Sequence, residues 1–431
     1  MRVLVLGSGG REHAIAWRLK QDPDSPEVLC APGNPGMAAV GRCVPADLAD
    51  VASVLALAER ERVDLTVVGP EAALERGIAD LFRRAGRAIV GPSQAASALE
   101  CSKAFAKRFM QRAGIPTARF RICHTAVEAM EAVARSRFGF PVVVKADGLA
   151  AGKGVVIAED RAEAEAAIHR MMIDGEFGEA GSTIVIEECL TGPEVSFFVL
   201  ADGERAVPLG SAQDHKRIFD DDRGPNTGGM GAFAPSPLMT RALESEVMTK
   251  IVQPVLDLMR ADGERYRGFL YVSLMLTPSG PKVIEFNVRF GDPEAQAIMP
   301  IIDGDFSGAL LASATSGLSE SMIRLRPDRV VGVVLASAGY PGVVKTGESI
   351  AGLERATARP DTLVFQAGTT RVDGRLVTSG GRVLTVVGRG TTFEAAMHAA
   401  YSAAGDIHFN GMQYRRDIGR KALGVAVEPD L

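Results

Sequence analysis

The segment 1–90 alternates short apolar runs with longer amphipathic stretches, and this alternation limits the possible folds more than any other feature of the chain. Strands separated by helices at such spacing form a parallel sheet with helices on both faces. We therefore predict an N-terminal doubly wound parallel sheet within an α/β and α+β multidomain protein. Its strands are expected near 3–6, 28–29, 65–68 and 88–90, and its helices at about 11–20, 48–60 and 74–85.

A segment that contains glycine or proline follows each predicted strand. Ligands of such sheets lie beyond the carboxyl ends of the strands, so we expect these segments to rim one pocket. Alternatively, Gly-Pro only ends a strand. For the last segment, Gly91–Ser93, a pocket rim and a simple strand end are equally supported. The segments are Gly7–Gly10, Ala31–Asn34, Gly69–Glu71 and Gly91–Ser93.

The turn at Gly7–Gly10 opens a predicted helix and offers backbone N–H groups to an anion. It does not match the dinucleotide fingerprint G-x-G-x-x-G, because Glu12 takes the place of the last glycine. The second strand also ends in Cys30-Ala-Pro, without the acidic residue that binds a ribose diol. A single phosphate monoester therefore fits this loop better than a nicotinamide cofactor.

A second glycine-rich stretch, Lys145–Gly154, lies between two runs of valine and isoleucine and predicts a tight loop joining two strands. It is not a Walker A loop, because only three residues separate Gly148 from Gly152 and glycine stands at 154 instead of Ser or Thr. Such a hairpin is often only a mobile turn. The flanking Lys145 and Lys153 favour a polyphosphate ligand instead.

The segment 119–188 around this loop predicts a small α+β lobe that carries the loop at its tip, as a lid would. One helix is predicted before it, over 94–113. The apolar strand that closes the lobe ends in Glu187-Glu188. These carboxylates are either an exposed strand end or part of a hinge whose backbone faces an adenine while Glu194 reaches a ribose. The residues alone leave both interpretations open.

Two apolar strands, 269–276 and 282–289, predict a hairpin with a polar face. In the second strand Glu285, Asn287 and Arg289 alternate with apolar residues, so they lie on one face, roughly 6–7 Å apart. Carboxylate and amide oxygens at this spacing suit magnesium shared with phosphates, and the arginine suits a carboxylate or phosphate. A solvated strand face is the alternative.

Two further regions carry weaker signals. The long polar segment 211–231 has little periodicity, and its glycines and aromatics favour an ordered binding loop. Its His215 has no second His or Cys at ligand spacing, so we do not expect a metal ligand there. From about 329 onward, strands near 331–336, 363–366 and 383–387 and a helix over 392–404 predict a supporting domain.

Composition narrows the class of protein. The chain has 431 residues, enough for roughly three domains, and a formal net charge of −5 without a long basic run, which argues against nucleic acid as a partner. Five scattered cysteines give neither zinc spacing nor a disulfide framework. No apolar stretch is long enough for a membrane span or a signal-peptide core. We expect a cytoplasmic protein without a membrane partner.

Six segments together closely resemble the phosphoribosylamine–glycine ligase (glycinamide ribonucleotide synthetase) family of the ATP-grasp superfamily. The resemblance covers essentially the whole chain, down to Asp406–His408 and Arg416–Gly419. The segments are Gly7–His13, Ala31–Asn34, Lys145–Gly154, Gln213–Lys216, Gly224–Gly231 and Glu285–Glu294.

The resemblance implies an activity and an architecture. The activity is the ATP-dependent joining of glycine to 5-phosphoribosylamine through glycyl phosphate, with Mg²⁺ or Mn²⁺, in purine biosynthesis. The chain would be a monomer or a weak dimer. The implied domains are an N-terminal Rossmann-like domain (1–100), an ATP-grasp central domain (101–118 and 189–325), its inserted lid (119–188) and a C-terminal domain (326–431).

The resemblance also implies roles for individual residues. Catalysis would fall to Arg289, Lys145 and Asp214, and the metal to Glu285 and Asn287. Glycine and phosphoribosylamine would lie among Gly9, Gly10, Asn34, Asp214, Lys216 and Arg289. ATP would contact Lys103, Lys145, Gly148, Gly152, Lys153, Gly154, Glu187, Glu188, Leu190 and Glu194.

Three positions depart from the family pattern. Ser8, Ala73 and Val288 stand where Asn, Pro and Cys are usual. Val288 should point away from the ligands by the strand alternation, and Ser8 keeps a short polar group at the phosphate loop. Two rival functions remain at this point: another ATP-dependent carboxylate ligase of the same fold, and a nucleotide-binding regulator without turnover.

Overall fold

The N-terminal segment forms the predicted parallel sheet. In the computed structural model, which describes residues 1–135, 138–148 and 154–424, its strand order is β3-β2-β1-β4-β5. Alternate residues of β1 enter two different hydrophobic cores, so the sheet is buried on both faces. The helix predicted over 74–85 is two helices, because Gly77 adopts a φ of +76° between them. The elements are β1 (Arg2–Gly7), α1 (Gly10–Lys20), β2 (Glu27–Pro32), β3 (Arg42–Cys43), α2 (Val51–Arg60), β4 (Leu65–Val68), α3 (Glu71–Glu75), α4 (Ile78–Arg84) and β5 (Ala88–Val90).

The helix predicted over 94–113 is also wrong as a single element. It is two helices, α5 (Gln94–Cys101) and α6 (Lys103–Ala113), which meet at Ser102. The Ser102 hydroxyl accepts a hydrogen bond from the Phe105 N–H and donates one to Asp147 at 3.0 Å. Ser102 therefore caps α6 and ties it to the strand that leads into the glycine-rich loop.

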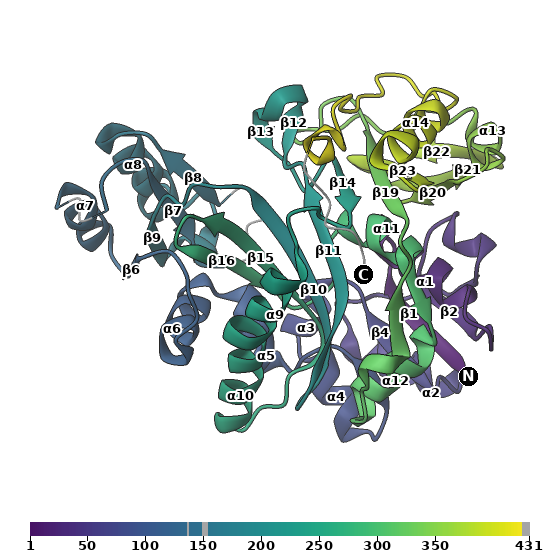
Figure 1. The fold of residues 1–431 in the computed structure, drawn as a ribbon, viewed down its shortest axis with the longest axis horizontal. Coiled ribbons are helices and arrows are strands. Elements are labelled where there is room, and N and C mark those ends of the chain that lie inside the picture. Colours follow the sequence, from purple (N-terminus) through teal and green to yellow (C-terminus); the bar gives the residue numbers. More distant parts are fainter. Residues whose placement is uncertain (136–137, 149–153, 425–431) are drawn as a thin grey trace.

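The lid forms the expected small α+β lobe, which stands apart from the body in Figure 1. Its antiparallel sheet has the order β6-β9-β7-β8 and packs with its helices around a hydrophobic core of its own. The glycine-rich loop joins β7 to β8, as predicted. The elements are β6 (Phe120–Cys123), α7 (Ala126–Ala134), β7 (Val142–Ala146), β8 (Val155–Ala158), α8 (Arg161–Ile168) and β9 (Ile184–Glu188).

One eight-stranded antiparallel sheet runs through the rest of the chain, in the order β16-β15-β10-β11-β14-β19-β23-β20. The predicted hairpin of β15 and β16 lies at one edge, and the C-terminal strands continue the sheet through the pairing of β14 with β19. The central and C-terminal parts thus share one sheet, and the domain limits given above stay a prediction. The strands are β10 (Glu194–Asp202), β11 (Ala206–Asp214), β14 (Gly231–Ala234), β15 (Arg267–Thr277), β16 (Gly280–Asn287), β19 (Arg329–Ala336), β20 (Thr362–Gln366) and β23 (Arg382–Gly390).

Helices cover this sheet, and three separate two-stranded sheets, β12-β13, β17-β18 and β21-β22, complete the described part of the chain. Among the described residues no helix is long and apolar enough to cross a membrane. The hairpin β21–β22 was not predicted from the sequence. The remaining elements are α9 (Arg241–Val247), α10 (Gln253–Ala261), α11 (Glu294–Ile298), β17 (Ile302–Gly304), α12 (Phe306–Thr315), β18 (Ile323–Leu325), α13 (Leu353–Thr357), β21 (Thr369–Val372), β22 (Arg375–Thr378) and α14 (Phe393–Ala404).

The polar segment 211–231 is more regular than expected. It contains the end of β11, a projecting hairpin of β12 (Arg217–Phe219) and β13 (Arg223–Asn226), and the start of β14. The acidic run at 220–222 makes the turn of the hairpin. The segment looked irregular in the sequence because the partners that order it lie about 200 residues away.

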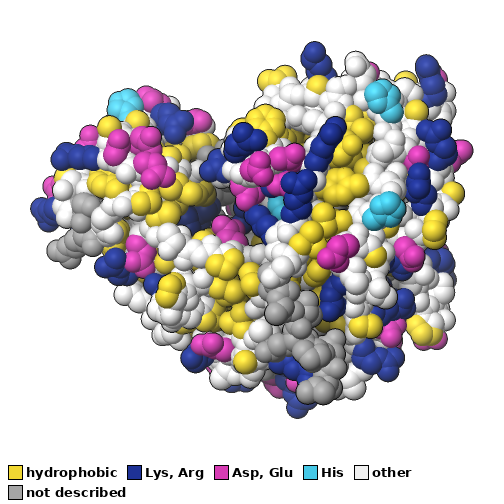
Figure 2. All heavy atoms as spheres, turned by 45° about the horizontal axis from the view of Figure 1, so that its top comes forward, with side chains coloured by type: hydrophobic (Ala, Val, Ile, Leu, Met, Phe, Trp, Pro, Cys, Tyr) yellow, Lys and Arg dark blue, Asp and Glu magenta, His cyan; other side chains and the backbone are white. Residues whose placement is uncertain are grey.

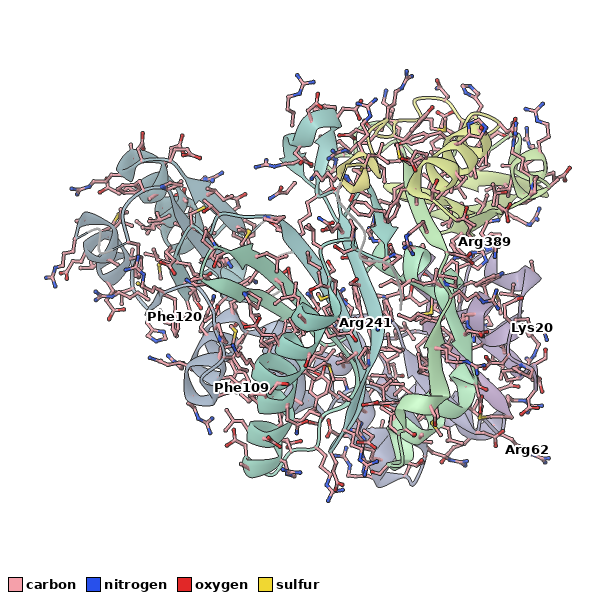
Figure 3. The ribbon with its side chains drawn as sticks, in the orientation of Figure 1. Lys20, Arg62, Phe109, Phe120, Arg241 and Arg389 are labelled. Atoms are coloured by element: carbon pink, nitrogen blue, oxygen red, sulfur yellow. The ribbon has the colours of Figure 1, made fainter. Side chains whose placement is uncertain are left out.

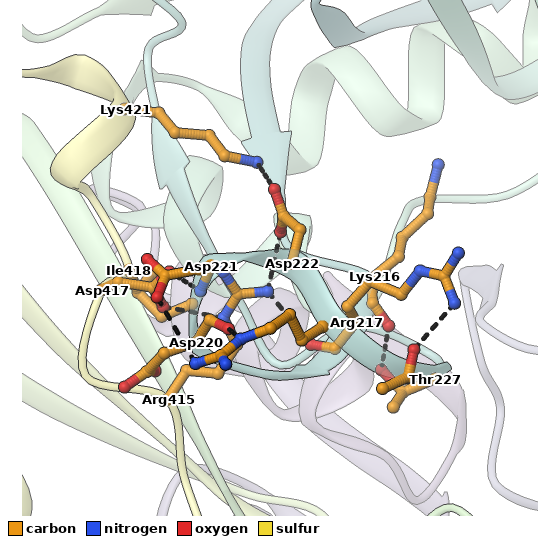
Figure 4. Close-up of polar contacts among 12 residues, drawn as sticks. Lys216, Arg217, Asp220, Asp221, Asp222, Thr227, Arg415, Asp417, Ile418 and Lys421 are labelled. Atoms are coloured by element: carbon orange, nitrogen blue, oxygen red, sulfur yellow. Dashed lines mark hydrogen bonds and ion pairs between the residues drawn. The ribbon is translucent and has the colours of Figure 1, made fainter.

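Those partners belong to the C-terminal segment and centre on Arg415 (Figure 4). The Arg415 side chain is 0% exposed and donates to Asp417 at 2.6 and 2.8 Å and to Asp222 at 2.9 Å. Lys421 forms a second ion pair with Asp222 at 2.6 Å. A buried guanidinium with two carboxylate partners therefore fastens the hairpin to the C-terminal segment.

We expect Arg415→Gln to lower the free energy of unfolding by about 3 kcal/mol, because it leaves Asp417 without its buried partner. The matched control is Arg416→Gln at the exposed neighbouring position, which should change stability by less than about 0.5 kcal/mol. Urea unfolding followed by circular dichroism measures both. Equal effects of the two substitutions would contradict the role assigned to Arg415.

Candidate active site

Several predicted ligand-binding residues that the structure describes border the cleft between the lid and the body. Figure 2 shows the surface hollowed between these two lobes, with Lys, Arg, Asp and Glu side chains gathered along the wall of the body. The lid contributes β7 and β9, and the body contributes α6, the end of β11 and the polar face of β16. Segments far apart in the sequence thus contribute to one site.

Two buried lysines share one carboxylate on the lid side of the cleft. Lys145 Nζ lies 3.0 Å and Lys107 Nζ 2.9 Å from Glu187 Oε2. Burial lowers the pKa of Lys107 to about 8, although Glu187 opposes this shift. Sequence reasoning missed Lys107, whose signal was its position four residues after Lys103 on one helix face. Glu187 Oε2 holds both lysines, and the buried Oε1 of the same carboxylate has no hydrogen-bond partner among the described residues.

Helix α6 anchors the start of the glycine-rich loop. The backbone N–H of Ala104 donates to the Asp147 carboxylate at 2.6 Å, and Lys103 Nζ donates to the Gly148 carbonyl at 3.2 Å. The Ala146 N–H donates to the Gly154 carbonyl at 2.8 Å and closes the base of the loop. The two other loop positions predicted to bind ATP, Gly152 and Lys153, lie outside the described residues.

Glu285 holds an ionised carboxylate in a ring of cations. Burial acts to raise its pKa, but the charges of four nearby cations hold the pKa below its usual value. No hydrogen bond or ion pair to this carboxylate occurs within the described part of the chain, so its oxygens face the cleft free. The cations are Lys216, Lys145, Lys103 and Arg289.

Asn287 completes the polar face of β16. It is 8% exposed, and its Oδ1 accepts a hydrogen bond from Arg289 at 3.4 Å. The intervening Phe286 and Val288 are buried in a hydrophobic core, so the predicted alternation is confirmed and a solvated strand face is excluded. Among the described residues no three His, Cys, Asp or Glu side chains meet as a metal cluster. A cation at this face would therefore need further oxygen atoms from a bound substrate or nucleotide to complete its coordination.

Two carboxylates fix the Arg289 guanidinium. Arg289 Nε donates to Glu71 at 3.1 Å, and Nη2 lies 2.8 Å from Glu100. Burial alone would lower the pKa of Arg289, but these carboxylates raise it above its ordinary value. Glu71 belongs to a predicted rim segment. Glu100 lies within α5, and no sequence signal singled it out.

Asp214 is a carboxyl group whose charge is finely balanced. Burial raises the pKa of Asp214 to about 7, with the like charges of Glu294 and Glu194 adding to the shift and Lys216 opposing it. Lys216 Nζ lies 4.0 Å from Asp214 and donates to Glu194 at 2.8 Å. The buried Glu294 was not predicted from the sequence. Asp214 can therefore exchange a proton near neutral pH.

His215 points away from its two neighbours in this group. It is 1% exposed and its ring packs against Phe233, with centroids 5.9 Å apart. Burial lowers the pKa of His215 to about 4, so the ring is neutral. His215, just beyond the end of β11, is therefore buried against Phe233, apart from the charged group of Asp214 and Lys216.

The glycine turn at the start of α1 differs from the predicted anion site, because carboxylates of the protein lie beside its N–H groups. The Gly9 N–H already donates to Glu12 Oε2 at 2.7 Å, and Glu12 pairs with Arg11. A Cβ at Gly9 would also stand 3.4 Å from Asp292 Oδ2. Carboxylates therefore border this turn, and the groups that stay available to a ligand are mixed donors and acceptors.

Asn34 has an engaged side chain. Its amide nitrogen donates to the carbonyls of Ser8 and Gln366, both at 2.8 Å. Its Oδ1 accepts the N–H groups of Gly36 and Met37, both at 2.9 Å. The amide thus shapes the rim and joins it to β20, and the backbone carbonyl of Asn34 already accepts the Ala38 N–H at 3.1 Å.

Glu188 holds the junction between the lid and the body. Its carboxylate accepts the backbone N–H of Arg119 at 3.0 Å and the side-chain Nε at 2.6 Å, and it binds Lys282 at 3.2 Å. Leu190 follows just beyond β9 and is partly buried. The paired carboxylates at this strand end are therefore not simply exposed. Each one holds cations that connect lid and body.

Comparisons with known proteins agree with this geometry. Three family profiles, the N, ATP-grasp (A) and C domains of phosphoribosylglycinamide synthetase, match residues 1–100, 101–295 and 330–421. A phosphoribosylamine–glycine ligase of Ralstonia nicotianae is 49% identical over 98% of this chain and 100% of its own length, and one of Caulobacter vibrioides is 48% identical over 98% and 99%.

Solved structures place the fold in the same group. The crystal structure of a phosphoribosylamine–glycine ligase from Thermotoga maritima superposes with a TM-score of 0.85 at 36% identity, covering 97% of this chain and 100% of that one. A biotin carboxylase from Campylobacter jejuni has a TM-score of 0.72 at 14% identity, covering 97% and 94%. This second likeness concerns the fold alone.

We expect the melting temperature of the protein to fall more steeply with rising pH than that of Asp214→Asn. The folded state binds a proton at Asp214 up to about pH 7, whereas the unfolded state releases it near pH 3.9. This group's stabilising contribution is therefore full below about pH 4 and lost as the pH rises through about 7. Melting curves between about pH 5 and pH 8 measure the difference. Asp373→Asn, in an exposed turn, is the control and should keep the wild-type slope.

Proposed function

The chain belongs to the phosphoribosylglycinamide synthetase family, which makes it an ATP-dependent ligase of purine biosynthesis, and from this premise we propose how its own residues carry out the reaction. Glycine and 5-phosphoribosylamine react with ATP to give glycinamide ribonucleotide, ADP and phosphate. The observation that carries the assignment of roles is the free, ionised Glu285 carboxylate within its ring of cations. We propose a cytoplasmic monomer or weak dimer.

ATP lies along the lid side of the cleft. Lys103 and Lys145 contact its phosphates, supported by their fixed positions beside Gly148 and Glu187. The glycine-rich loop, including Gly148, Gly152, Lys153 and Gly154, folds over the phosphates. The backbone from Glu187 to Leu190 lines the adenine, and Glu194 reaches the ribose.

The polar face of β16 fits a divalent cation. Glu285 offers two free carboxylate oxygens and Asn287 an amide oxygen on the same strand face, which is the oxygen donor set that Mg²⁺ or Mn²⁺ prefers. The cation would complete its coordination with phosphate oxygens, because among the described residues no three His, Cys, Asp or Glu side chains meet there. When bound, it neutralises charge on the transferring phosphoryl group.

The glycine carboxylate is activated before the bond forms. One of its oxygens attacks the γ-phosphorus of ATP, the bond to the bridging oxygen breaks, and ADP leaves with that electron pair. Arg289, held by Glu71 and Glu100, presents its positive charge to this group without having to reorganise. The product of this step is glycyl phosphate.

Amide formation follows in the same cleft. The amine of phosphoribosylamine attacks the acyl carbon of glycyl phosphate, and inorganic phosphate departs with the former carboxylate oxygen. Asp214, whose pKa is about 7, accepts the proton that the attacking amine loses. Gly9, Gly10, Asn34 and Lys216 border the space left for glycine and phosphoribosylamine. The lid excludes water, which would otherwise hydrolyse the acyl phosphate.

One assay tests the function directly. A coupled measurement of ADP release should require both glycine and freshly made phosphoribosylamine. ADP release with a different carboxylate or amine would favour another ligase of this fold. Nucleotide binding without any turnover would favour a regulator.

We expect Glu285→Gln to lower turnover at least ~100-fold while the fold stays intact, because the variant lacks the charge that holds the cation where phosphoryl charge develops. Steady-state rates at limiting magnesium measure this loss. The control Glu204→Gln lies on an exposed turn of the same sheet and should keep the wild-type rate. A Glu285→Gln enzyme with near-normal turnover would remove this residue from the metal site.

We also expect glycine labelled with oxygen-18 in its carboxylate to pass one labelled oxygen to inorganic phosphate in each turnover. The reason is that acyl phosphate formation makes a glycine oxygen the bridge to phosphorus, and the amine later displaces that oxygen with the phosphate. Mass spectrometry of the released phosphate reads the transfer. Phosphate free of label, or an isolated phosphorylated enzyme, would show that the reaction takes another route.

A further inference from the structure

A second hollow lies apart from the cleft, where the C-terminal end of α1 faces the strands β17, β18 and β23. Its volume is about 220 Å³. We call it the arginine pocket, because its wall includes Arg18, Arg324, Arg326 and Arg389, together with Trp17 and Asp303. None of these residues takes part in the reaction described above. Figure 3 labels Arg389 in the C-terminal part of the chain and Lys20 at the end of α1.

The pocket has a marked excess of positive charge. Four arginines and one aspartate line it, which gives a formal charge of +3 (four minus one) in a chain whose net charge is −5. The arginines come from three separate parts of the sequence, so the excess arises only in the folded protein. Concave walls of one charge sign concentrate small ions of the opposite sign.

Three of these arginines have spare hydrogen-bonding capacity. Arg326 and Arg324 share a single carboxylate, with Nη2 atoms 3.3 and 3.8 Å from Asp303. Arg389 lies 3.8 Å from Asp361, and its Nε is buried without a hydrogen-bond partner among the described residues. The carboxylates Asp303 and Asp361 therefore leave N–H donors of these three guanidinium groups unused.

Arg18 has a different role in the same wall. Its guanidinium donates to the carbonyls of Ile302 at 2.8 Å and Gly304 at 2.9 Å, and it pairs with the buried Asp22 at 2.6 Å. These bonds fix the back of the pocket and the position of Asp303 beside it. The guanidinium of Arg18 is thus already satisfied by protein groups, which distinguishes it from the other three arginines.

We propose that the arginine pocket binds a small phosphate dianion. Guanidinium groups bind phosphate through paired N–H donors. Three of them line this pocket besides Arg18, and two of these share the single carboxylate of Asp303. The volume suits a phosphate group with a few waters and is below the ~300 Å³ at which sites for larger organic ligands begin. The ligand is either free inorganic phosphate or the phosphate end of a larger molecule that projects outward past Trp17.

Trp17 gives a direct readout, because it is the only tryptophan of the chain and lines the pocket. Inorganic phosphate titrated into the wild-type protein at low salt should change Trp17 fluorescence saturably, with calorimetry as a parallel measurement. The double substitution Arg324→Gln/Arg326→Gln should weaken this binding at least ~10-fold. Arg389→Lys keeps the charge but loses the Nε donor, and it should weaken binding by a few-fold.

Two controls separate the pocket from other effects. Arg371→Gln/Arg375→Gln makes the same change in net charge on the exposed β21–β22 hairpin and should leave the affinity unchanged. Lys145→Met disables the phosphate side of the cleft and should keep the Trp17 response. ADP release by Arg324→Gln/Arg326→Gln should stay at the wild-type rate, which shows that this variant folds.

The outcomes divide clearly. Tighter binding of adenosine monophosphate than of phosphate would identify the phosphate end of a larger molecule as the ligand, and weaker binding would identify the free ion. Either result supports the pocket. Absence of saturable binding of both probes, loss of the response in Lys145→Met, or an equal loss in the Arg371/Arg375 control would overturn the proposal.

Discussion

The ion pair that Lys145 and Lys107 form with Glu187 is the contact on which the cleft depends. Two ammonium groups buried side by side repel each other. One carboxylate within 3.0 Å of both offsets this repulsion and the cost of burying the two charges. The arrangement leaves positive charge facing the cleft. Glu285 is ionised although its burial favours the neutral acid, because Lys216 and, after it, Lys145 and two further cations hold its pKa below the usual value. A site that binds a polyphosphate together with a metal ion needs positive charge for the phosphates and an ionised carboxylate for the metal.

The same site is assembled by fastenings between distant parts of the chain. The pairing of β14 with β19 continues the central sheet into the C-terminal part. Asn34 ties the N-terminal rim to the carbonyl of Gln366, and Arg415 ties the β12–β13 hairpin to the C-terminal segment. The C-terminal part is therefore more than a supporting domain. It holds in place two loops that border the ligand cleft.

The cleft and the arginine pocket treat positive charge differently. In the cleft, Glu71, Glu100 and Glu187 hold the cations at fixed positions, so a ligand meets groups that are already oriented. In the arginine pocket one aspartate is shared by two arginines, and the Arg389 Nε has no hydrogen-bond partner among the described residues. The first arrangement favours a defined chemical step, and the second favours simple binding of an anion.

Local pattern in the sequence determined the parallel N-terminal sheet, the lid lobe and the polar face of β16, because strand alternation and glycine spacing depend on near neighbours along the chain. Tertiary structure alone decided which polar groups meet. In the sequence, Lys107 and Glu100 look like ordinary charged residues of amphipathic helices. Only the packing of the chain brings them to Glu187 and Arg289. The break at Ser102 likewise needed Asp147, 45 residues away. Burial and charge are properties of the assembled cleft, so the pKa near 7 of a carboxyl group in it could not be read from the sequence.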